Sequence, residues 1–484
     1  MDTQPVIYWF RQDLRLADLP GLVEAASNGI PVVPVYVLDD AAPGEWAPGA
    51  ASRWWLHHSL KSLAASIRQQ HGSLWFHMGS AAQRLIELAA QTDARGIYCS
   101  RAFEPWAVQQ ERDVQRRATR AGLAFERFGG SLLFDPEQIR TQSGTFYQTF
   151  TPFWKACRQQ PEPSPPQPAP PQIRWHPASG LALDDLRLTA KPPPSAAHWP
   201  SLWQPGEAGA AAALRQFLDD GLAGYQQGRE LPGQAGTSRL SPHLHFGELS
   251  PRQLWHAIQT YCPDDASLAV HRDRFLAQLG WREFSHHLLY HFPALPNAPF
   301  NSAYQQFPWI EDAAALAAWR EGRTGYPLVD AGMRELSQTG HMHNRVRMVT
   351  ASFLTKHLLQ PWQAGERWFW DTLVDANLAN NAASWQWVSG SGADAAPYFR
   401  IFNPTLQGQR FDPEGSYVRR WVPELAALPN RHLHTPVAAP EAVLKAAGVR
   451  LGDTYPKPIV DHRQARSAAL AAYREMRNTS APTG

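Results

Sequence analysis

The segment near the carboxyl end of the chain carries the side chains best suited to electron transfer. Residues 368–402 hold Asn381, Trp385 and Trp387 close together. Because residues four apart share one face of a helix, Asn381 and Trp385 are expected side by side. The amide can hydrogen-bond the edge of a flavin ring, and the indole can pass an electron to that ring. A buried asparagine with satisfied bonds beside a core tryptophan is the alternative.

A second candidate is the loop Thr237-Ser-Arg-Leu-Ser241, which follows Gly233 and Gly236 and precedes Pro242. Hydroxyl groups and free backbone N–H groups at the start of a helix suit an anionic pyrophosphate. Taken alone, a helix cap and a turn explain the loop better. It is therefore weaker evidence for a cofactor than the tryptophan-rich segment.

Several common chemistries lack their motifs in this sequence. It contains no GxGxxG, P-loop lysine motif, GxSxG or HExxH. The histidine pairs His287/His291 and His341/His343 are expected to lack a nearby carboxylate or thiolate partner, and we interpret both as structural. A net charge of +2 gives no general field for nucleic acid, so a DNA-binding surface must come from local clusters.

The chain that positions these residues shows a strand-and-helix pattern in its first part and a purely helical pattern in its second part. Val6–Phe10, Val32–Leu38 and Gly96–Cys99 are typical of short buried strands, and helical stretches at 51–70 and 81–92 separate them. Beyond about residue 208 the pattern is helical. The fold predicted is an α/β, Rossmann-like domain with a parallel sheet (1–135), a long proline-rich linker (136–205) and an all-α domain (206–484).

Composition also bounds the class of protein. No apolar run approaches the length of a membrane span, and Met1–Pro5 leads directly into the first predicted strand. Cys99, Cys157 and Cys262 are far apart and match no disulfide or metal spacing. We therefore expect a cytoplasmic protein with no membrane association.

Ordered motifs occur along nearly the entire chain. They are Trp9–Arg15, Thr237–Ser241, Trp281–Phe284, Met342–Arg345, Asp375–Trp387, Asn403–Thr405 and Pro458–His462. In these motifs the sequence resembles the photolyases and cryptochromes, and specifically the class I photolyases that act on cyclobutane pyrimidine dimers. The resemblance implies a flavin cofactor, an electron relay and a DNA partner.

The cofactor implied by the resemblance is FAD, anionic and fully reduced in the active state, bound in the helical domain. Asn381 corresponds to the residue beside the flavin N5, where a neutral amide stabilises the reduced ring without a repulsive charge. Asn377 stands where several relatives have an aspartate, and it keeps an acceptor for the cofactor. The matching cofactor contacts are Tyr225, Thr237, Ser238, Arg239, Leu240, Ser241, Asp375, Ala376, Asn377 and Asn381.

The family's electron relay corresponds to Trp385, Trp362 and Trp309, leading from the flavin to the surface. All three indoles are present in this chain. Without the resemblance, a packing residue after Pro361 is the alternative interpretation of Trp362; with it, the relay is favoured.

The implied partner is UV-damaged DNA. Trp281 and Trp387 match the walls around a flipped-out dimer, since chemistry on a stacked base requires its extrusion. Asn344 and Met348 lie one helical turn apart and match the dimer-specific pair, whereas relatives that repair (6-4) photoproducts have two histidines there. Further predicted DNA or base contacts are Arg229, Arg345 and Gln407, with Arg400 as an additional cation at the same face.

Gln278 departs from the family pattern, in which the dimer photolyases carry a glutamate three residues before Trp281. We count it with Trp385, Trp362, Trp309 and Asn381 among the catalytic candidates, because its amide can still hydrogen-bond the base carbonyls. An amide supplies neither the charge nor the proton of a carboxyl group, so weaker repair without loss of activity is expected.

The amino-terminal domain is expected to hold a second, antenna chromophore, either a deazaflavin or methenyltetrahydrofolate. The segments Phe103–Trp106 and Glu111–Asp113 lack the Asn-Glu pair associated with the folate and are more similar to relatives using a deazaflavin. A monomer without an obligate protein partner is expected. The rival interpretations are a cryptochrome, a blue-light receptor with little or no repair, and a dark FAD oxidoreductase, for which no substrate motif is present.

Overall fold

The computed structural model describes residues 4–261 and 266–480, so Cys262 lies outside the described residues. Chain contacts divide it into two compact units. Unit 1 comprises Met1–Ala223, Ser238–Pro293 and Val374–Leu378, and unit 2 comprises Gly224–Thr237, Ala294–Leu373 and Ala379–Gly484. The units cut the chain differently from the three predicted domains, which stay a prediction.

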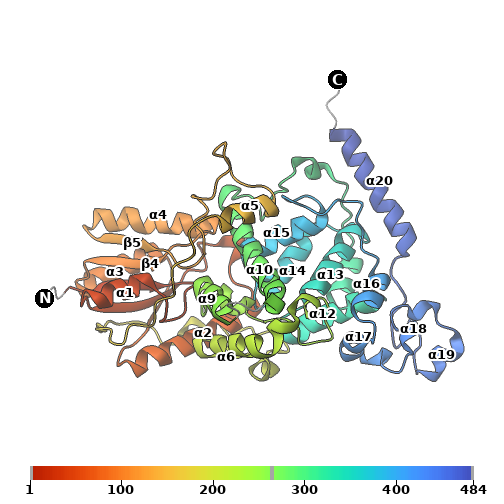
Figure 1. Ribbon diagram of the computed structural model, residues 1–484, viewed down its shortest axis with the longest axis horizontal. Helices are drawn as coiled ribbons and strands as arrows, with labels where there is room; N and C mark the ends of the chain where they lie inside the picture. Colours follow the sequence, from red (N-terminus) through yellow and green to blue (C-terminus); the bar gives the residue numbers. More distant parts are fainter. Residues whose placement is uncertain (1–3, 262–265, 481–484) are drawn as a thin grey trace. The chain divides into compact units, whose positions relative to one another are not determined.

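Unit 1 contains a parallel sheet, drawn in red and orange in Figure 1, whose strand order is β3-β2-β1-β4-β5. The central strand β1 pairs in parallel with β2 on one side and with β4 on the other. This confirms the predicted α/β fold and its three predicted strands. The strands are β1 (Val6–Phe10), β2 (Val32–Leu38), β3 (Trp75–Met78), β4 (Gly96–Ser100) and β5 (Ala124–Phe128).

Helices cover both faces of this sheet, which explains why its inner strands β1, β2 and β4 are buried at every position. Tyr8 and Phe10 of β1 belong to one core with residues of α1 (Pro20–Ser27) and α2 (Ala50–Gln69). Ile7 and Trp9 belong to a second core with residues of α3 (Ala81–Thr92) and α4 (Pro105–Arg120). Because successive side chains of β1 point to opposite faces of the sheet, this one strand contributes to the apolar core on each face.

The proline-rich segment is an extended, mostly exposed stretch that is nevertheless attached to unit 1. The backbone N–H of Gln167 donates to Asp18 Oδ1 at 3.1 Å, and its carbonyl accepts the N–H of Asp18 at 2.8 Å. Asp18 is also ion-paired with Arg252 at 2.6 Å. The predicted linker is thus held along the unit rather than free.

The remaining part of unit 1 and most of unit 2 are helical, as the sequence predicted. Further helices in unit 1 are α5 (Phe150–Arg158), α6 (Glu207–Gln216), α8 (Ser241–His245), α9 (Pro251–Tyr261) and α10 (Ala266–His291). Those of unit 2 are α7 (Tyr225–Gly228), α11 (Ala313–Arg320), α12 (Pro327–Thr339), α13 (Asn344–Lys356), α14 (Trp362–Thr372), α16 (Pro404–Phe411), α17 (Ser416–Trp421), α18 (Asn430–Leu433), α19 (Glu441–Ala446) and α20 (His462–Ser480), with α15 (Leu378–Ser389) lying almost entirely there. Among the described residues, none of these helices combines the length and apolarity needed to cross a bilayer.

Candidate cofactor and substrate site

Residues Ser238–Ser241 of the predicted phosphate loop belong to unit 1 and lead into α8, whereas Thr237 belongs to unit 2. Ser241 Oγ donates a 2.6 Å hydrogen bond to Asp375 Oδ2, which joins two of the predicted cofactor residues across the chain. Arg239 adopts a left-handed backbone conformation with φ of 52°, and its guanidinium lies 4.0 Å above the ring of Trp203. Leu240 and Ala376 are buried, whereas the Ser241 side chain is exposed and accessible to a ligand.

Asn377 contacts a histidine that the sequence did not single out. Its Nδ2 lies 3.4 Å from His286 Nε2, and His286 Nδ1 lies 2.9 Å from the carbonyl of Arg282. Burial and nearby Arg282 lower the pKa of His286 to about 3, so the ring is neutral at pH 7. Nδ1–H therefore donates to the carbonyl, and Nε2 accepts from the Asn377 amide. An aspartate at this position would have no proton to donate.

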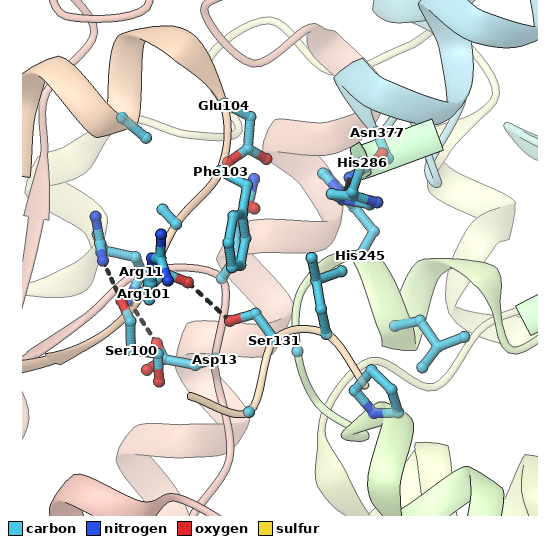
Figure 2. A pocket seen from close by; sticks show the side chains of 18 of the residues that line it. Arg11, Asp13, Ser100, Arg101, Phe103, Glu104, Ser131, His245, His286 and Asn377 are labelled. Carbon is cyan, nitrogen blue, oxygen red and sulfur yellow. Dashed lines mark hydrogen bonds between the residues drawn. The ribbon is translucent and has the colours of Figure 1, made fainter. Parts of the chain in front are cut away.

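A cavity of about 50 Å³ lies beside these residues within unit 1 (Figure 2). His245, His286 and Asn377 line one part of it. Burial lowers the pKa of His245 to about 4, and its Nδ1 has no hydrogen-bond partner among the described residues. A buried polar atom without a partner suits a polar ligand, because leaving it unsatisfied is costly.

Phe103, Glu104 and Trp106, from the segment predicted to face the antenna chromophore, line another part of the same cavity. Arg11 lies beside them, packed 4.4 Å from the ring of Trp9 and ion-paired with Glu111 at 2.7 Å. Arg11 Nη1 is buried and, in the described part of the chain, has no hydrogen-bond partner. The lining offers charge and an aromatic face to a second ligand.

In unit 2, α15 places Asn381 and Trp385 one turn apart, as predicted. Asn381 Nδ2 donates a 3.0 Å bond to the carbonyl of Glu366, which orients the amide. The Trp385 ring is 2% exposed and meets Phe369 edge-on at a centroid distance of 5.0 Å. A Cβ added at Gly365 would lie 2.1 Å from Trp385 Cη2, so glycine makes room for the indole.

The other two tryptophans of the predicted relay differ in burial. Trp362, the first residue of α14, is 1% exposed, and Trp309 is half-buried. Trp309 packs against Phe307 with ring centroids 4.3 Å apart. The burial is compatible with a path that ends near the surface at Trp309, and the relay itself stays a prediction.

The predicted lesion-reading pair also lies in unit 2, at the start of α13. Asn344 Nδ2 and Arg345 Nη1 approach the sulfur of Met348 at 4.0 and 3.9 Å. The charge of Arg345 is compensated by Glu230, which the sequence did not single out. Of the remaining predicted residues in this unit, Tyr225 is buried, Arg229 is mostly buried, and Thr237, Trp387 and Gln407 are partly exposed.

Trp281 and Gln278 lie on α10 in unit 1. One face of the Trp281 ring stacks on Phe150, with centroids 4.0 Å apart and planes at 9°. Trp281, predicted as one wall of the substrate pocket, is therefore backed by a second ring, supplied by α5 in the linker segment. Gln278 Nε2 lies 3.4 Å from the carbonyl of Arg274.

The histidine pairs have structural partners. His287 Nε2 accepts the N–H of Tyr147 at 3.1 Å, and His343 Nδ1 accepts the N–H of Arg345 at the start of α13. The expectation that His341 lacks a carboxylate is wrong, because Glu335 lies 3.7 Å from it, brought there by α12. Within residues 4–261 and 266–480, no group of three side chains has the makeup of a metal site.

Comparison with known proteins decides what these features belong to. A family model described as the FAD binding domain of DNA photolyase matches residues 275–475, and one described as DNA photolyase matches residues 6–172. A deoxyribodipyrimidine photo-lyase of Agrobacterium fabrum is 46% identical over 99% of this chain and 100% of its own. The chain belongs to the photolyase/cryptochrome family.

Within the family, both functional branches have relatives of this chain. Cryptochrome-1 of Arabidopsis thaliana is 37% identical over 97% of this chain and 70% of its own length. A solved structure, described as a bacterial class III photolyase from Agrobacterium tumefaciens, has a TM-score of 0.94 at 45% identity, covering 99% of this chain and 98% of that one. The expected class I membership is not confirmed.

The predicted enzyme type, a photolyase with an FAD-binding domain, is thereby confirmed at the level of the family. The residues present fit FAD. In unit 1, Ser238, Ser241 and Asp375 offer hydroxyls and a carboxylate, and His245 offers a buried ring nitrogen lacking a described partner. In unit 2, Asn381 offers an oriented amide beside an indole.

Proposed function

We propose that this photolyase uses light to split cyclobutane pyrimidine dimers in DNA, and that it belongs to the class III branch. The observation that carries the proposal is the contact of Asn344 and Met348 at the start of α13. Neither side chain transfers protons near neutral pH, whereas reversal of a cyclobutane dimer needs only an electron and its return. The 45% identity to a class III photolyase supports the branch.

Reduced FAD, when bound in this protein and excited by blue light, would supply the electron. The protein's residues bind and orient the partners of that transfer. Ser238, Ser241 and Asp375 hold the polar part of the cofactor, and Asn381 presents a neutral amide that tolerates the added charge of the reduced ring. Their side chains act by fixed position and take no part in proton transfer.

Trp281 and Trp387 receive the extruded dimer, and Gln278 donates a hydrogen bond to a base carbonyl. The stack of Trp281 on Phe150 supports this role, because it fixes the plane on which a base can lie. Arg229 and Arg345 contact the phosphates of the damaged strand, which position the DNA but do not read its sequence.

We further propose that the antenna chromophore binds at the part of the unit 1 cavity that Phe103, Glu104 and Arg11 line, away from the part lined by His245 and Asn377. A volume of about 50 Å³ holds only a few water molecules, so a pigment must displace side chains of this lining. Acid release of the bound pigments from purified protein, followed by absorption spectra, distinguishes a deazaflavin from methenyltetrahydrofolate. Arg11→Ala is expected to lose the pigment and keep FAD.

A cryptochrome-type photoreceptor is the second candidate, because cryptochromes are among the relatives that match nearly all of this chain. The experiment that separates the two uses the reduced, FAD-loaded protein and defined oligonucleotides carrying a thymine dimer or a (6-4) photoproduct. Light-dependent reversal of only the thymine dimer is expected. Normal flavin photoreduction without reversal of either lesion would favour the photoreceptor.

A further inference from the structure

Glu230 connects two arginines of unit 2 that come from different parts of the chain. Its Oε2 is ion-paired with Nη2 of Arg345 on α13, and its Oε1 lies 3.6 Å from Nε of Arg229, the neighbouring residue after α7. All three side chains are partly open to solvent, with exposed fractions of 24% for Glu230, 21% for Arg345 and 11% for Arg229. One carboxylate thus serves two guanidinium groups.

Aromatic rings hold these guanidinium groups in place. Arg345 lies 4.4 Å above the ring of Phe411, and Arg229 lies 5.6 Å above the ring of Tyr225. A guanidinium packed on an aromatic face directs its five N–H donors outward in its own plane, where they can bond acceptors such as a carboxylate or a phosphate. Arg345 Nε is buried and has no hydrogen-bond partner in the part of the chain that the structure describes.

Arg345 also contacts the lesion-reading pair directly, since its Nη1 lies 3.9 Å from the sulfur of Met348, which Asn344 approaches at 4.0 Å. A chain of contacts therefore runs from Glu230 through Arg345 to Met348 and Asn344. A shift of the Arg345 guanidinium would alter the surface offered to a base.

We propose that Glu230 is a specificity-determining positioning residue, which lowers affinity for undamaged DNA and holds Arg345 against Met348 so that the lesion is preferred. The proposal rests on the proposed function, because it assigns the two arginines to DNA. Two guanidinium groups and one carboxylate leave one net positive charge for phosphate. Without Glu230, both cations would bind any strand, since phosphate contacts carry no sequence information.

The test measures binding of undamaged and thymine-dimer oligonucleotides by fluorescence anisotropy over a series of salt concentrations. Glu230→Gln is expected to bind undamaged DNA about fivefold more tightly, the equivalent of the upper end of an exposed ion pair. The slope of log affinity against log salt is expected to steepen by about 0.9, the value for one further phosphate contact. The ratio of dimer to undamaged affinity is expected to fall.

Glu424→Gln is the matched control. Glu424 pairs with Arg334 at 2.8 Å in the same unit, and their exposed fractions of 23% and 21% match those of Glu230 and Arg345. The control removes the same charge and is expected to leave binding unchanged. Glu230→Asp, which keeps the charge on a shorter stem, is expected to restore weak binding of undamaged DNA.

Three results would overturn the proposal: equal effects of Glu230→Gln and Glu424→Gln, an unchanged salt slope in Glu230→Gln, or an equal loss of affinity for both oligonucleotides. The undamaged-DNA measurements test Glu230 whether or not the wild-type protein repairs dimers. A wild-type protein that binds DNA but reverses no lesion would contradict only the proposed function.

Discussion

The two units hold their predicted functional residues by different kinds of contact. In unit 1, polar groups meet in defined pairs, such as Ser241 with Asp375 and Asn377 with His286. In unit 2, the Trp385 ring packs against Phe369 and Trp319, and it fits there because Gly365 has no side chain. Unit 1 should therefore respond to changes of charge and protonation, and unit 2 to changes of ring type and volume.

The largest effect is expected from Trp385→Phe in unit 2. Phenylalanine fills most of the same space but is much harder to oxidise than indole, so photoreduction of the oxidised flavin should slow by roughly 100-fold, equivalent to about 2.7 kcal/mol in the barrier. Laser-flash absorption measures this rate. Trp319→Phe, a change to a ring that packs on Trp385 outside the predicted relay, is the control and should keep the rate. Equal slowing in the control would contradict the assignment.

The next effect concerns Lys356, a buried cation in the aromatic part of unit 2. Its ammonium lies 5.0 Å above the ring of Tyr398, and burial lowers its pKa from 10.5 to about 7. The unfolded chain binds the lysine proton more strongly than the folded protein does. The contribution of Lys356 to the free energy of unfolding therefore rises with pH between 7 and 10.5 and is lowest at and below pH 7. Lys356→Met should raise the free energy of unfolding at pH 7 by on the order of 3 kcal/mol.

Denaturant unfolding at pH 7 and at pH 10 measures the effect of Lys356→Met. The gain should shrink toward pH 10, where the native protein already carries the neutral amine. A gain of the same size at both pH values would show that the lysine is charged in the folded protein and unfolded chain alike.

A smaller effect is expected from Asn377→Asp in unit 1. A carboxylate only accepts hydrogen bonds, so the contact with His286 Nε2 survives only if that nitrogen gains a proton. The pKa of His286 should rise from about 3 by at least one unit, about 1.4 kcal/mol. NMR titration of the histidine ring nitrogens measures this shift. An unchanged pKa and tautomer would remove the proposed role of the amide.

The smallest effect is expected from Gln278→Glu. A charged hydrogen bond exceeds a neutral one by about 1 kcal/mol, so the quantum yield of dimer repair should rise by up to about fivefold. Gln253→Glu, at a glutamine that bonds the N–H of Ser250 in the same unit, is the matched control. An unchanged yield in Gln278→Glu would show that the departure at this position does not limit repair.

The sequence predicted the sheet only in part. Val6–Phe10 and Val32–Leu38 are buried along their whole length, and their unbroken apolar runs identified them. Ala124–Phe128 is a mostly exposed edge strand with charged residues, and Trp75–Met78 has four residues, so neither gave a strand pattern of its own. Their places come from pairing with strands distant in the sequence.

Among the candidate site residues, too, neighbours on one helix could be predicted from the sequence, whereas partners distant in the sequence could not. Spacing along one helix predicted the neighbours Asn381/Trp385 and Asn344/Met348, because a helix repeats at a known period. The partners Glu230 and His286, by contrast, are joined to Arg345 and Asn377 over separations of 115 and 91 residues. Charge type and spacing hold no information about such pairs, which only the folded chain brings together.

The most direct test of the account compares light-driven dimer reversal in wild-type protein and Trp385→Phe after both have been chemically reduced in the dark. If the predicted relay of Trp385, Trp362 and Trp309 serves only to re-reduce the cofactor, the reduced variant should reverse a thymine dimer in blue light at nearly the wild-type rate, while failing to photoreduce from the oxidised state. Loss of reversal in the reduced variant, or no reversal by the wild-type protein, would contradict the account.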